Sequence, residues 1–182
     1  MSESITHEEA VKIGIREGIK YLKDQEFHKT KKRYDRRLRN TRLLLRNYRN
    51  LQMHYKLAES SVKYIEQEKA IDVLDDIEAI DDEEQYVQAI SRTKERTKAM
   101  VKHIDRVLKY YDIICKAEGG LKKRRCDIIK ALYVDPVKDD VIPTYQDVGV
   151  KLDISGKTVA RDVWRAIEDI SVLLFGIDGI KL

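Results

Sequence analysis

The placement of glycine and proline is the feature of this chain that most restricts its fold. All eight glycines and both prolines lie outside residues 19 to 118, so this long middle stretch lacks the two strongest helix breakers. Charged residues make up 37% of the chain, which is typical of long helices with extensive surface. We therefore predict an all-α protein whose residues 1–118 form a long helical hairpin or coiled-coil body.

Apolar spacing predicts three helices in this body, from about His7 to Asp24, from about Lys29 to Lys69 and from about Glu84 to Lys116. The second helix carries an inner apolar stripe made of Tyr34, Leu38, Thr41, Leu45 and Tyr48. The third has a heptad register, with Ile90, Thr97, Ile104 and Tyr111 at one position and Val101, Leu108 and Cys115 at the other. Packing within one chain and a coiled coil between two chains, hence a homodimer, both fit this register.

Gly119-Gly120 predicts a boundary between the body and a compact C-terminal domain of residues 121–182. The domain opens with a leading helix whose apolar residues are Leu121, Ile128, Ile129, Leu132 and Tyr133. Asp135-Pro136 ends that helix, and residues 137–143 form a loop.

Residues 144–176 have the pattern of a helix-turn-helix. Thr144 is a good N-cap for a short first helix, and Ser155 is a good N-cap for a longer second one. Gly149 lets the second helix cross closely. Asp153 stands where many such turns have glycine, so we expect it to adopt a left-handed or bridging conformation.

The second helix of this motif has two faces. Its inner face carries apolar residues at spacings of three and four, namely Val159, Val163, Ile167, Ile170 and Leu174. Its outer face presents the candidate DNA base contacts Lys157, Ala160, Arg161 and Trp164, because Lys and Arg donate to guanine edges and alanine contacts thymine methyl groups. Candidate contacts to the DNA backbone are Thr144, Lys151, Ser155, Thr158 and Arg165. The alternatives are an ordinary pair of packed helices and, for Trp164, packing beneath the leading helix or against a partner subunit.

Two charge blocks lie in the body. Residues 29–56 contain eleven Lys and Arg against one acid, and residues 66–84 contain ten acids against one lysine. A possible basic ridge on the second helix consists of Arg36, Arg39, Arg42, Arg46 and Arg49. The ridge can bind nucleic-acid phosphates, pair with the acidic block, or be a solvated helix face. A second basic cluster, residues 122–125, is either a backbone contact beside the recognition helix or a solvated linker.

Several classes of function lack sequence support. We find no phosphate-binding loop, dinucleotide fingerprint or nucleophile elbow, so we predict no catalytic residue and no cofactor. The scattered histidines lack the spacing of a metal site. The acids Asp75, Asp76, Asp81 and Asp82 lack the ligand pattern of a calcium loop, so we predict that this acidic block is a solvated linker. Cys115 and Cys126 are predicted to be reduced and partly buried thiols. The absence of an apolar span and of a signal peptide predicts a cytoplasmic protein without a membrane partner.

The C-terminal third resembles the ArpU and RinA type of phage late-gene transcription regulators, and also the last DNA-binding module of sigma factors. The residues that carry the resemblance are Tyr145-Gln-Asp-Val-Gly, Leu152-Asp-Ile-Ser-Gly-Lys-Thr-Val-Ala-Arg, Arg165-Ala-Ile and Leu173-Leu-Phe-Gly, preceded by the helical segment from Arg124 to Tyr133. The resemblance implies a factor in a bacterial host cell, associated with the nucleoid, that binds double-stranded DNA and activates a late phage or prophage operon. A sigma-like factor that binds RNA polymerase and a helical DNA-packaging adaptor similar to a terminase small subunit are the alternatives.

Overall fold

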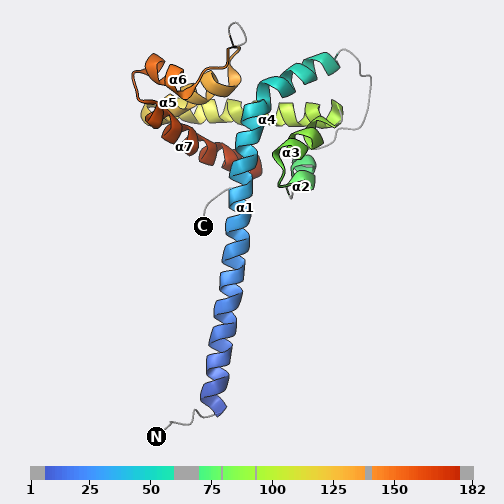
Figure 1. Ribbon diagram of the computed structural model, residues 1–182, viewed down its shortest axis with the longest axis vertical. Helices are drawn as coiled ribbons and strands as arrows, with labels where there is room; N and C mark the ends of the chain where they lie inside the picture. Colours follow the sequence, from blue (N-terminus) through green and yellow to red (C-terminus); the bar gives the residue numbers. More distant parts are fainter. Residues whose placement is uncertain (1–6, 60–69, 79, 93, 138–140, 177–182) are drawn as a thin grey trace.

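The computed structural model describes residues 7–59, 70–78, 80–92, 94–137 and 141–176, and all of its regular structure is helical. No strand occurs in these ranges, so the prediction of an all-α protein is confirmed. The elements are α1 (His7–Glu59), α2 (Ala70–Ile77), α3 (Glu83–Ser91), α4 (Lys94–Glu118), α5 (Gly120–Ile129), the π-helical turn η1 (Lys130–Val134), α6 (Tyr145–Leu152) and α7 (Gly156–Phe175). In Figure 1 the other helices gather around the C-terminal half of α1.

The first two predicted helices are one continuous helix, α1. The expected interruption between Asp24 and Lys29 is wrong because residues 25–28 contain no glycine or proline, and the helix runs through them. The part of the second predicted helix that covers residues 60–69 lies outside the described residues.

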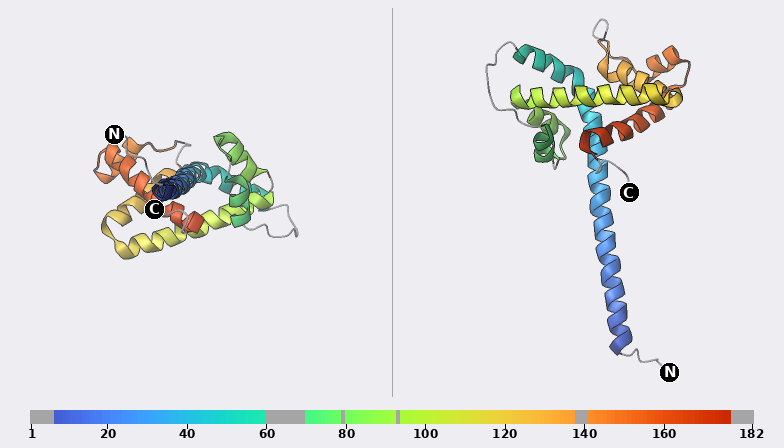
Figure 2. Two further views of the ribbon diagram at one scale, coloured as in Figure 1. Left: turned by 90° about the horizontal axis from the view of Figure 1, so that it is seen from below. Right: turned by 180° about the vertical axis from the view of Figure 1, so that it is seen from behind.

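The two halves of α1 differ in their surroundings. Residues 12–33 are all exposed, and this half projects away from the other helices (Figures 1 and 2). The other half carries the predicted inner stripe, in which Leu38, Thr41, Leu45 and Tyr48 are buried and Tyr34 is half-buried. The stripe is therefore confirmed, and it explains why only this half packs against the rest of the chain.

The third predicted helix is divided into α3 and α4. Heptad residues are nevertheless buried on both sides of the break, including Ile90 on α3 and Thr97, Ile104 and Tyr111 on α4, whereas Leu108 is half-buried. The hydroxyl of Thr97 donates to the carbonyl of Ile90 at 3.3 Å, which joins the two helices across the break. The seam is thus used for packing within the chain.

The acidic block was expected to be a solvated linker, but part of it is helical. Helix α2 lies within it and buries Val73, Leu74 and Ile77. Asp82 caps α3 by accepting a hydrogen bond from the Gln85 N–H at 2.8 Å. The linker prediction is wrong here because three apolar residues at helical spacing lie among the acids.

Helices α4 and α7 cross α1 and contact it, as Figure 1 and the two views of Figure 2 show. The chain turns from α4 into α5 at Gly119 and Gly120, whose φ angles of 68° and 47° favour glycine. The predicted boundary coincides with this corner. Buried residues from both sides of it belong to one hydrophobic core, which includes Leu45 of α1 and Ile167 of α7.

The predicted leading helix is α5 continued by η1. Ile128, Ile129, Leu132 and Tyr133 are buried as expected, whereas Leu121 is 59% exposed and does not contribute to the core. The element ends where Asp135 donates its N–H to the Lys130 carbonyl at 2.8 Å, directly before Pro136.

Candidate nucleic-acid interface

The corner between α6 and α7 has the geometry of a helix-turn-helix. Thr144 caps α6 in a reciprocal capping box with Asp147. Ser155 caps α7 by accepting from the Thr158 N–H at 3.1 Å. Asp153 lies between the helices with φ 54° and ψ 45°, the left-handed conformation that we expected. Two caps and one left-handed residue thus define the turn.

Gly149 allows the two helices to approach closely. A Cβ atom at this position would lie 2.6 Å from the carbonyl oxygen of Ile154, so no larger residue fits without a backbone shift. The Ile154 N–H also donates to the Gly149 carbonyl at 2.9 Å. The close crossing predicted from the sequence is confirmed.

The inner face of α7 is buried along the whole helix. Val159, Val163, Ile167, Ile170 and Leu174 are each at most 2% exposed, as predicted. Ala166 and Asp162 are buried beside them. Because this face is embedded in the core, α7 presents its opposite face in a defined orientation.

All four candidate base contacts lie on that outer face. Lys157, Ala160 and Arg161 are exposed near the start of α7, and Trp164 is 45% exposed one turn further on. Neither Lys157 nor Arg161 forms an ion pair or side-chain hydrogen bond with any residue that the structure describes. Their cationic groups are therefore available to a ligand in solution.

The candidate backbone contacts lie around this face, and they differ in whether their side chains already form hydrogen bonds within the protein. Lys151 is exposed at the end of α6. The N–H and the hydroxyl of Thr144 both donate to Asp147 at 2.7 Å, and this hydrogen bonding lowers the pKa of Asp147. Ser155 and Thr158 are hydrogen-bonded to each other at 3.0 Å. Of these four residues, Lys151 alone has a side chain that the turn itself does not use.

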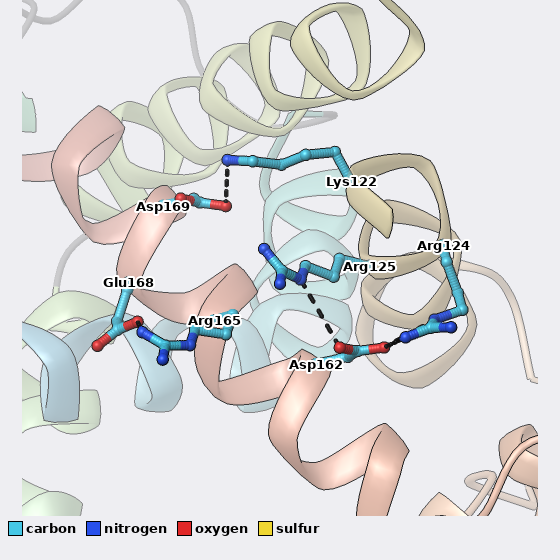
Figure 3. A network of polar contacts seen from close by, with 7 residues as sticks. All are labelled: Lys122, Arg124, Arg125, Asp162, Arg165, Glu168 and Asp169. Carbon is cyan, nitrogen blue, oxygen red and sulfur yellow. Dashed lines mark hydrogen bonds and ion pairs between the residues drawn. The ribbon is translucent and has the colours of Figure 1, made fainter. Parts of the chain in front are cut away.

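Trp164 packs beside α1. The guanidinium of Arg42 lies over its indole ring, 5.3 Å from the ring centroid, and its Nε1 donates to Glu168 at 3.2 Å. The alternative expectation, packing beneath the leading helix, is wrong because α5 lies against the other side of α7 (Figure 3). Sequence reasoning did not foresee the pairing with Arg42, since it depends on how α1 crosses α7.

Glu168 connects three side chains at this crossing. It accepts from the Tyr34 hydroxyl at 3.3 Å, from Trp164 and from Arg165 at 3.1 Å. Burial and the nearby carboxylate raise the pKa of Tyr34. Arg165, predicted as a backbone contact, is thus exposed but already paired with a carboxylate (Figure 3).

The residues of the predicted basic ridge have different partners. Arg36 and Arg39 line a shallow hollow on α1 together with His28, Lys31, Lys32 and Asp35. Arg42 stacks on Trp164, and Arg46 is exposed. Arg49 donates to the carbonyls of Ala131 and Asp135 at the end of η1. Of these five arginines only Arg46 is exposed, whereas Arg42 is half-buried and contacts the outer face of α7 through Trp164.

Part of the acidic block pairs with α1, as one of the sequence alternatives proposed. Glu78 lies 3.3 Å from Arg37 and 3.8 Å from Arg33, and Asp81 lies 3.3 Å from Arg39. Arg39 also donates to the backbone carbonyls of Ile80 and Asp81. These contacts hold the segment between α2 and α3 against α1.

Residues 122–125 are part of helix α5, so the interpretation as a solvated linker is wrong, whereas a contact with the DNA backbone stays a prediction. Arg124 and Arg125 face Asp162 of α7 at 2.6 and 3.7 Å, and Lys122 binds Asp169 at 2.8 Å (Figure 3). The signal in the sequence was the pair of acids spaced seven apart on α7, on the side opposite the outer face. These ion pairs join α5 to α7 and are structural.

The thiols of Cys115 and Cys126 are free and buried, as predicted. Burial raises the pKa of Cys126 to about 12, so this thiol stays protonated near neutral pH. Within the described ranges, no group of three or more His, Cys, Asp or Glu side chains is placed to hold a metal ion. The same ranges contain no helix with the length and apolar character needed to cross a membrane.

Comparison with known proteins found no match among protein-family models, curated proteins or solved structures.

Proposed function

We propose that this protein is a sequence-specific DNA-binding transcription regulator that inserts the start of α7 into the major groove. The observation that carries the proposal is the exposure of Lys157, Ala160 and Arg161 on a helix whose opposite face is fully buried. Lys and Arg donate to the O6 and N7 acceptors of guanine, and the alanine methyl group suits a thymine methyl group. A helix presented at a capped turn is the usual reading element of this motif.

The surface of α1 next to α7 supplies phosphate contacts in this proposal. Arg42 is held over Trp164, and Arg46 lies one turn further along α1. Arginines at such positions neutralise phosphates and orient a protein on the duplex without selecting a sequence. Arg39 and Arg49 are excluded from this role, because their donors bind the loop after α2 and the end of η1.

The biological role follows from the resemblance of residues 124–176 to phage late-gene regulators. In this role the protein activates a late phage or prophage operon from a site near its promoter. Activation of this operon, and any contact with RNA polymerase, are further parts of the proposal. Both depend on DNA binding, so DNA binding is tested first.

The test is a selection of bound fragments from random DNA, followed by affinity measurements on the selected site and on scrambled DNA. Arg161→Ala should cost about 1–3 kcal/mol on the selected site and relax the preference at one base pair. Arg46→Ala is the matched control, because it should weaken binding to both DNAs alike and reduce the dependence of affinity on salt. If Arg161→Ala weakens both DNAs equally, the assignment of Arg161 to base recognition is wrong. Absence of binding to any DNA overturns the proposed function.

A further inference from the structure

The projecting half of α1 exposes several large apolar side chains to solvent. Six large apolar side chains in it are between 50% and 64% exposed, namely Ile13, Ile15, Ile19, Tyr21, Leu22 and Phe27. Three of them, Ile15, Ile19 and Leu22, are spaced by four and three residues and therefore share one face. Contiguous exposed apolar surface of this kind marks an interaction site.

The same half has little intrinsic support as a single helix. Helices in proteins gain most of their stability from packing of an apolar face, and residues 12–33 are exposed rather than packed against the other residues that the structure describes. Gly14 and Gly18 each weaken the helix by about 1 kcal/mol relative to alanine. A Cβ atom at Gly18 would meet nothing within 4 Å, so packing in the single chain does not explain this glycine. Gly18 lies between Ile15 and Leu22 on the apolar face, where its small size allows another helix to approach.

The charges at the two ends of this half identify its partner. Glu8 and Glu9 precede the apolar face, whereas residues 28–33 contain Lys29, Lys31, Lys32 and Arg33 and no acid. Two copies placed side by side in the same direction would bring the basic ends together. Two copies placed in opposite directions bring each acidic end against a basic end, which favours pairing.

We propose that residues 8–29 of α1 pair with the same segment of a second copy in an antiparallel arrangement, with Ile15, Ile19 and Leu22 at the interface. The paired segment is about 30 Å long at the rise of an α-helix. In this dimer the two α7 helices lie toward opposite ends of the paired rod. The proposal is independent of DNA binding, because it uses no residue of α5, α6 or α7.

The first test is the mass of the full chain in solution, measured by sedimentation equilibrium over a range of concentrations. The unmodified chain should be a dimer, and Ile19→Asp should convert it to a monomer at the same concentrations. Ile13→Asp is the matched control: Ile13 is exposed to the same 50% as Ile19 but lies on the opposite face of the helix. A monomeric unmodified chain, or equal behaviour of the two variants, overturns the pairing.

The second test measures the orientation. Lys29 lies on the same side of α1 as the apolar face, and Lys31 lies on the opposite side. Lys29→Glu places an acid near the acidic end of the antiparallel partner, so the dimer dissociation constant should rise by at least about threefold, since the change acts twice in a symmetric dimer. Lys31→Glu carries the same charge change and should have a smaller effect. A tighter Lys29→Glu dimer would indicate parallel pairing and overturn the proposal, as would equal effects of the two variants.

Discussion

Two groups of basic residues on neighbouring helices differ in their surroundings: one is paired with carboxylates inside the protein, and the other is exposed to solvent. Lys122, Arg124 and Arg125 of α5 face carboxylates on the inner side of α7, whereas Lys157 and Arg161 of α7 face solvent. Both groups are clusters of cations in the sequence, and both are candidates for contact with DNA on composition alone. Only the second is free among the described residues.

The difference lies in the facing helix. Asp162 is 3% exposed and receives two guanidinium groups, so the cations of α5 are neutralised where they meet α7. Among the residues that the structure describes, no carboxylate pairs with Lys157 or Arg161 in this way. A basic cluster therefore becomes a binding surface only where the fold leaves its charges without an internal partner, and this depends on helices distant in the chain.

Asp162→Ala should have the largest effect on stability, because it removes the carboxylate that neutralises the cations of α5. It leaves Arg124 and Arg125 partly buried without their carboxylate, so the free energy of unfolding should fall by about 3–5 kcal/mol. Urea unfolding followed by circular dichroism measures the loss. Asp169→Ala is the matched control on the same helix: Asp169 is 31% exposed and binds one lysine, so about 1 kcal/mol or less is expected. Equal losses in the two variants would contradict the structural role of Asp162.

Asp112→Asn tests a further internal charge cluster, where α4 meets the start of η1. Asp112 on α4 accepts from Lys116 at 2.7 Å, from Lys130 at 2.5 Å and from the Cys126 thiol at 3.4 Å. The hydrogen bonds from these lysines hold the pKa of Asp112 well below its ordinary value. At neutral pH the substitution should lower the free energy of unfolding by about 1.5–3 kcal/mol.

The effect of Asp112→Asn should depend on pH in a defined direction. A carboxyl group with a depressed pKa stabilises the fold above its unfolded pKa of about 3.9 and loses this contribution as the pH falls toward its folded pKa. The difference in stability between the original chain and the variant should therefore narrow below about pH 4. Asp127→Asn, which removes a pairing with Lys123 inside α5, is the control and should show a much smaller difference at both pH values. A difference that grows with acidity would show that Asp112 is not stabilised as an anion.

Local features of the fold were predictable from the sequence, because each depends on a few neighbouring residues. The caps at Thr144 and Ser155 and the left-handed Asp153 follow from the chemistry of those side chains. The exposure of Lys157 and Arg161 follows from the spacing of the apolar residues, since burial of one face of α7 turns the other face outward. These features cover most of the candidate site.

Features that depend on the crossing of distant helices were not predictable in this way. The position of Arg42 over Trp164 requires the angle between α1 and α7, and the pairing of Arg124 with Asp162 requires the packing of α5 on α7. The spacing of apolar residues predicts which face of a single helix is buried, but it does not predict how two distant helices cross or pack. For the same reason, continuous heptads across residues 90–111 did not reveal that α3 and α4 are separate helices.

Arg161→Ala should have the smallest effect on stability. It tests the exposed cations of α7 in the way that Asp162→Ala tests the paired cations of α5. Arg161 is exposed and has no partner among the described residues, so the free energy of unfolding should change by no more than about 0.5 kcal/mol. Alanine is also a slightly better helix former, which offsets any small loss. The same urea titration, run beside Asp162→Ala, measures the contrast. If Arg161→Ala destabilised the chain as Asp162→Ala does, Arg161 would have to hold the fold together, and its guanidinium would then not be free to bind DNA.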